Sequence, residues 1–76
     1  SIQALCSALG RVFAERGNVR RGIIYHEREF DFGPHPSALH SLKALQPLYE
    51  REGRSAEFMA FCERVGTFLP ASPPTE

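Results

Sequence analysis

Residue types that could perform acid–base chemistry gather in the middle of this 76-residue sequence. They are His26, Glu27, Glu29, Asp31, His35 and His40. A carboxylate beside an imidazole can act as a general base, because histidine titrates near neutral pH. A catalytic site also needs a nucleophile, a base and an orienting group in a pocket, and a short chain encloses few pockets once its core is filled. No such set can be named here, so we predict a protein that is not an enzyme and has no catalytic residues.

The same sequence offers metal ligands, although their spacing argues against a metal site. Cys6 and Cys62 lie far apart, and His35 and His40 do not share one helical face. Structural zinc sites usually draw on ligand pairs only a few residues apart. Both cysteines fall on apolar helical faces, where a free thiol behaves as a small hydrophobic side chain. We predict no bound metal, no cofactor and two reduced cysteines in the core.

Arginines cluster around Gly17 and Asn18, where a helix is expected to end. Arg16, Arg20 and Arg21 lie within a few positions of each other, and guanidinium groups at a helix end can bind phosphates. The whole chain is neutral, however, with nine basic and nine acidic residues, so no overall field attracts a polyanion. The acids of the next segment would also repel a phosphate backbone. Nucleic-acid binding through this cluster is therefore the alternative function.

Protein binding accounts for more of the chain. An exposed strand edge pairs readily with another chain, and aromatic and arginine side chains dominate binding interfaces. Tyr25, Tyr49 and Phe61 lie beside the apolar stripes rather than on them, which indicates an apolar surface patch. The predicted partner is another protein or a second copy of the chain, and no membrane. The predicted binding residues are Arg16, Arg20, Arg21, Tyr25, Arg28, Glu29 and Asp31.

The elements that position these residues begin with a helix. Ser1 is expected to cap it, and Gly17-Asn18 to end it, because both of those residues tolerate the left-handed conformation. Apolar residues recur along it at intervals of three and four, and it could pack in a dimer as well as on its own core. Its apolar face carries Ile2, Leu5, Cys6, Leu9, Val12 and Phe13.

The pattern changes over residues 19–32 to one typical of β structure. A β-branched and aromatic run occupies residues 23–25. Residues 29–32 then alternate, which would place both phenylalanines on one face and both acids on the other. The prediction is a β-hairpin or one bent strand whose apolar face is covered by the helices.

Proline and glycine residues divide the C-terminal half. Residues 33–36 disfavour helix and lead into a second helical region. Pro47 lies inside that region and predicts a kink or a break into two short helices. A polar turn containing Gly53 precedes a last helix that Ser55 is expected to cap. Residues 70–76 are predicted to be a Pro-rich disordered tail or linker.

The predicted fold is α+β and mainly α, in the order helix, β-hairpin or bent strand, helix, helix. Residues 1–69 form one globular domain, and no internal repeat is evident. No apolar stretch is long enough to cross a bilayer. We predict a non-catalytic interaction module, for self-association or as an adaptor, within a larger intracellular protein of the cytoplasm or nucleus.

Overall fold

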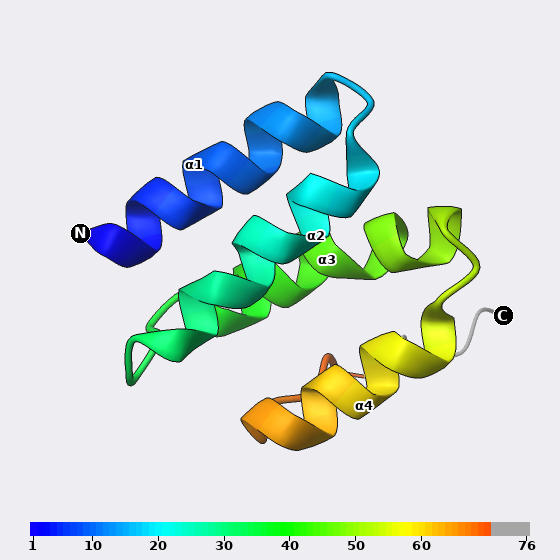
Figure 1. Cartoon of the computed structure of the whole chain (residues 1–76). Coiled ribbons are helices and arrows are strands. Elements are labelled where there is room, and N and C mark those ends of the chain that lie inside the picture. The colour runs from blue at the N-terminus through cyan, green and yellow to red at the C-terminus, as the bar shows by residue number, and fades with distance from the viewer. Residues whose placement is uncertain (71–76) are drawn as a thin grey trace, which may run out of the picture.

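The computed structural model describes residues 1–70 as helices joined by short turns (Figure 1). In chain order they are α1 (Ile2–Glu15), α2 (Val19–Arg28), the 3-10 helix η1 (Glu29–Asp31), α3 (Ala38–Arg51) and α4 (Ser55–Val65). Residues 1–70 contain no strand, so the predicted α+β class is wrong and the protein is a small helical fold. None of these helices is both long enough and apolar enough to cross a membrane. Most of the predicted tail, residues 71–76, lies outside the described residues.

The segment predicted as a β-hairpin or bent strand forms α2 and η1. The Asn18 side chain caps α2 by accepting a hydrogen bond from the Arg21 backbone amide at 3.2 Å. Apolar and small residues also recur here with helical spacing, and α2 buries Gly22, Ile23 and His26 on one face. Strand propensity is only a weak local preference, so burial of this face against the neighbouring helices decides the conformation.

The alternation at residues 29–32 is too short to identify a strand. In the 3-10 turn the Glu29 side chain is fully buried, whereas Asp31 and Phe32 are exposed. Phe30 is half-buried and meets the Phe61 ring edge-on, with 5.2 Å between the ring centroids. The predicted separation of acids and phenylalanines onto two faces is therefore wrong. A turn with about three residues per turn sends successive side chains in different directions.

Two glycines allow α1 and α2 to pack closely. A Cβ atom added at Gly10 would lie 2.8 Å from the His26 ring, which is far inside normal contact distance. A Cβ atom added at Gly22 would lie 3.1 Å from the Gly10 carbonyl oxygen and 3.2 Å from Ala14 Cβ. Larger side chains at either position would push the helices apart. Because glycine has no side chain at these two positions, α1 and α2 can approach closely, with the His26 ring packed against Gly10.

The apolar core is built by α2, α3 and α4. It contains Ile23, Leu42, Leu45, Leu48, Tyr49, Phe58, Phe61 and Cys62. Tyr49 and Phe61 belong to this core, so the prediction that they form a surface patch is wrong. Within α1 the buried residues are Cys6 and Gly10, and the helix lies at the edge of the molecule (Figure 1). The prediction of two free, buried cysteines is confirmed.

Helix α3 continues through its proline. Pro47 lies inside a helix that runs from Ala38 to Arg51, so the predicted break into two short helices is wrong. The proline itself is exposed, and it removes a single backbone donor. The face that α3 buries, which includes Leu42, Leu45 and Leu48, extends along the helix on both sides of it. Burial of this continuous face outweighs the lost hydrogen bond.

The four α-helices of residues 1–70 form two hairpins with the same turn hydrogen bonds, although α1 packs on α2 more closely than α3 packs on α4. Helix α3 begins 36 residues after α1, and α4 begins 36 residues after α2. The turn in each hairpin contains a glycine of positive φ, Gly17 at 86° and Gly53 at 68°. The sequence predicted both turns, and the left-handed conformation for the first of them. An internal repeat is therefore present, contrary to the expectation from sequence. It was missed because the predicted β segment hid the equivalence of α2 and α4.

Candidate functional site

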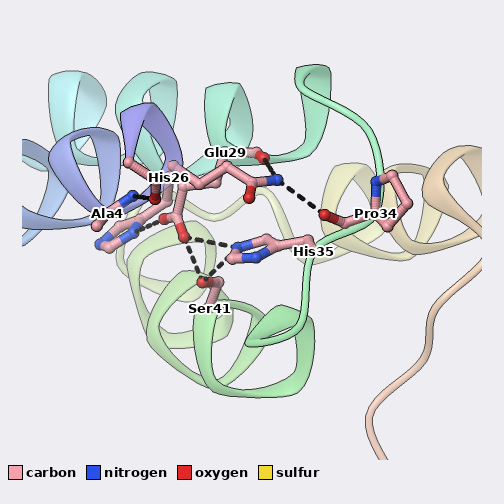
Figure 2. Close-up of polar contacts among 8 residues, drawn as sticks. Ala4, His26, Glu29, Pro34, His35 and Ser41 are labelled. Atoms are coloured by element: carbon pink, nitrogen blue, oxygen red, sulfur yellow. Dashed lines mark hydrogen bonds and ion pairs between the residues drawn. The ribbon is translucent and has the colours of Figure 1, made fainter.

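A buried carboxylate connects three segments at the junction of the two hairpins (Figure 2). Glu29 Oε2 lies 2.7 Å from His26 Nδ1, and Glu29 Oε1 lies 2.8 Å from His35 Nε2. Ser41 Oγ donates a hydrogen bond of 2.5 Å to the same Oε1 atom. The partners come from α2, from the loop after η1 and from α3. An ionised carboxylate only accepts hydrogen bonds, so both of these imidazole nitrogens carry the hydrogen.

Helix α1 contacts the same junction through the backbone. Gln3 Nε2 donates to the Glu29 carbonyl oxygen at 3.1 Å and to the Pro34 carbonyl oxygen at 3.2 Å (Figure 2). These bonds tie the N-terminal helix to the start and the middle of the loop that joins the hairpins. The loop is therefore held by side chains from α1, α2 and α3 together.

Hydrogen bonding controls the ionisation of Glu29. Burial alone would raise the pKa of its carboxyl group, because a low-dielectric interior disfavours charge. Hydrogen bonds from His26, Ser41 and His35 favour the charged form and bring the pKa below its ordinary value. Glu29 is therefore an ionised, fully hydrogen-bonded carboxylate at neutral pH.

This network has the residue types of a hydrolytic triad without its connectivity. In a triad the histidine directs one nitrogen to the serine and the other to the carboxylate. Here His35 directs Nε2 to both Glu29 and Ser41, and its buried Nδ1 atom has no hydrogen-bond partner among residues 1–70. Ser41 is buried and donates its proton to the carboxylate, so its hydroxyl is not activated for attack. The geometry supports a positioning role for this network.

Metal ligation finds no geometric support in the part of the chain that the structure describes. Among residues 1–70, no three histidine, cysteine, aspartate or glutamate side chains are placed to hold one ion. Cys6 and Cys62 lie on α1 and α4, which pack on different neighbours.

The arginines predicted to form one basic cluster lie on different sides of α2. Arg20 Nε is 3.8 Å from Glu52 Oε1 in the turn between α3 and α4. Arg21 instead places its guanidinium over the Phe13 ring of α1, 5.7 Å from the ring centroid. Arg16 is exposed just beyond the end of α1. The contacts of Arg20 and Arg21 thus direct the two guanidinium groups apart.

The remaining predicted binding residues divide between a groove and the interior. Arg28 covers the half-buried Tyr25 ring, 5.2 Å from its centroid. Arg28 and Asp31 both line an open groove between α2, the connecting loop and α4. Burial raises the pKa of Glu27 in the same groove, more than the nearby arginines lower it. Glu29 belongs to the buried network, so the predicted acidic surface loses one of its members.

One side of α1 is apolar and uncovered. We call this surface the α1 stripe; it consists of Ile2, Leu5, Leu9 and Val12. Ile2, Leu5 and Val12 are 53%, 59% and 40% exposed, and Leu9 is half-buried. Large exposed apolar patches are typical of surfaces that bind a partner. Helical spacing shows that a helix has an apolar side but not which neighbour covers it, so the sequence allowed this side to pack on the core or in a dimer.

Comparison with known proteins adds no relative. No protein-family model matches the chain, and neither a curated protein nor a solved structure matches it. The evidence for function therefore lies in the contacts and exposure of the chain's own residues.

Proposed function

We propose that this chain is a non-catalytic protein interaction module that binds its partner through the α1 stripe. The observation that carries this proposal is the exposure of Ile2, Leu5 and Val12 in one row on a helix at the edge of the fold. Burying one such side chain completely stabilises a complex by about 1.5–3 kcal/mol. Because these side chains are 40–59% exposed, each would contribute roughly half of that value, before the cost of association is subtracted.

The chemistry of the other surfaces supports the same assignment. The Glu29 network is buried and joins segments of the chain. Arg21 lies over the Phe13 ring, and Arg20 lies near the Glu52 carboxylate. The groove along α2 and α4 carries both signs of charge, so it does not form a phosphate-binding surface. The free thiols of Cys6 and Cys62 fit an intracellular location, where cysteines stay reduced.

A hydrophobic-dye titration tests whether the α1 stripe is an exposed apolar surface. We expect the folded protein to enhance the fluorescence of anilinonaphthalene sulfonate, and Leu5→Glu with Val12→Glu to remove most of that signal. Ala4→Glu is the matched control, because Ala4 is exposed on α1 outside the stripe. Dye binding that is absent from the wild type, or equal in all the variants, would contradict the proposal.

A further inference from the structure

The helices and turns of the two hairpins correspond in position at a spacing of 36, although α1 and α2 pack more closely than α3 and α4. Eight pairs are identical at this spacing: Ser1 and Ser37, Ala8 and Ala44, Leu9 and Leu45, Gly17 and Gly53, Glu27 and Glu63, Arg28 and Arg64, Phe32 and Phe68, and Pro34 and Pro70. Side-chain contacts repeat as well. Arg28 lies 5.2 Å from the Tyr25 centroid, and Arg64 lies 5.2 Å from the Phe61 centroid at the equivalent positions. Helical repeats of this kind have periods of about 34 to 47 residues and stack on each other.

The structure shows how one hairpin covers the next. Helix α3 turns Ser41 and Leu48 toward the first hairpin, where Ser41 bonds to Glu29 and Leu48 lines a small cavity with Ala14 and His26. Ser41 and Leu48 are 2% and 4% exposed. Ser41 and Leu48 therefore mark the side of α3, the first helix of the second hairpin, on which the first hairpin packs.

The equivalent side of α1 has no such cover. Leu5 is equivalent to Ser41 and Val12 to Leu48, yet they are 59% and 40% exposed. The α1 stripe is thus the surface that corresponds to the covered side of α3. The covering helix α2 also has an uncovered equivalent in α4. Ile23 of α2 is 1% exposed, whereas its counterpart Met59 of α4 is 52% exposed.

From this equivalence we infer that the α1 stripe binds the exposed α4 surface of a second copy, head to tail, and so reproduces the contact between α2 and α3. The inference rests on the proposed function, because it names the partner of the same stripe. We call the surface formed by Met59 of α4 and by Phe68, which follows the helix and lines the same pocket, the α4 patch. Helices α1 and α4 lie at opposite sides of the molecule (Figure 1). They therefore cannot meet within one copy, and their pairing adds copies in a row.

The residues at the matched positions fit this partner. At the internal junction the polar residues Ser41, Glu29 and His26 meet. Their equivalents are Leu5, Val65 and Cys62, and all three are apolar. Cys62 is buried in the core of its own copy, so Leu5 and Val65 are the two that a contact between copies would bring together. A buried polar group needs hydrogen-bond partners. The surfaces that would meet between copies lack the serine on one side and the carboxylate on the other, so neither would leave a polar group without its partner. The contact between copies would be apolar where the internal contact is hydrogen-bonded.

Sedimentation velocity on the full chain, with two complementary variants, tests the inference. Leu5→Glu destroys the α1 stripe and keeps the α4 patch, whereas Met59→Glu does the reverse. We expect the wild type to form dimers and longer species as concentration rises, and each variant alone to dissociate about tenfold or more readily. An equimolar mixture of the two variants retains one intact stripe and one intact patch, so it should form a heterodimer and nothing larger.

Matched controls and the remaining outcomes separate this inference from the proposed function. Ala4→Glu and Ala60→Glu add the same charge at exposed positions beside the two surfaces, and they should associate like the wild type. A wild type that stays monomeric while the α1 stripe still binds dye overturns the second copy as partner and leaves the interaction proposal standing. Loss of association in Leu5→Glu but not in Met59→Glu, with no recovery on mixing, indicates stripe-on-stripe pairing and also overturns the inference. Circular dichroism confirms that each variant is folded.

Discussion

Replacing Glu29 by glutamine tests whether the buried network stabilises the junction through its charge. The substitution keeps the side-chain shape but leaves a neutral acceptor for Ser41 and His35 and an amide facing His26. A hydrogen bond to a charged group contributes about 1.5–3 kcal/mol, against about 0.5–1.5 kcal/mol for a neutral one. With three such bonds at 2.5–2.8 Å, we expect the free energy of unfolding at pH 7 to fall by about 2–4 kcal/mol.

The pH dependence gives this prediction a definite sign. The pKa of Glu29 is lowered by folding, so the unfolded chain takes up a proton first as the solution is acidified. The stabilisation from Glu29 is therefore complete above the ordinary carboxyl pKa of 4.5 and is lost as the pH falls through the lower folded value. Glutamine does not titrate, so the stability of Glu29→Gln should lack this component, and the difference from the wild type should shrink in acid.

Urea unfolding followed by circular dichroism at 222 nm measures both effects. For a chain of this size the urea dependence is about 1 kcal/mol per molar, so the midpoint should move by about 2–4 M at pH 7. Glu63→Gln is the matched control, because Glu63 is exposed on α4. Equal stability of Glu29→Gln and wild type at pH 7, or parallel curves down to acid, would refute the view that charge-assisted hydrogen bonds hold this junction.

Two further predictions concern the glycine contact and the arginines. Gly10→Ala gains about 1 kcal/mol of helix propensity, but its Cβ atom would lie 2.8 Å from the His26 ring. Overpacking costs about 1–3 kcal/mol, so we expect a lower melting temperature. A variant that is more stable than the wild type would show that α1 and α2 can move apart freely. The nucleic-acid alternative requires retention on immobilised duplex DNA that falls steeply with salt and disappears in Arg20→Glu with Arg21→Glu. Because these guanidinium groups point to different sides of α2, we expect no retention at low salt, and salt-dependent retention would revive that alternative.

Local chemistry alone was enough to predict several elements. Ser1 accepts a hydrogen bond from the Ala4 amide and caps α1, as expected of a serine before an apolar-periodic run. Gly17 and Gly53 adopt positive φ in the turns where the sequence placed them. Cys62 is buried on an apolar face of α4, as predicted. Each of these features depends on residues within one or two helical turns.

The tertiary structure decided the rest. Residues 19–28 form a helix because Gly22 and His26 pack against Gly10, a contact with residues outside the local sequence window. Glu29 is buried because His26, His35 and Ser41 converge on it from three segments, although a lone glutamate in sequence normally indicates a solvated surface. The exposure of the α1 stripe depends on which helix lies beside it. Spacing along the chain reports that a helix has an apolar face, but only the packing of whole helices determines whether that face is covered.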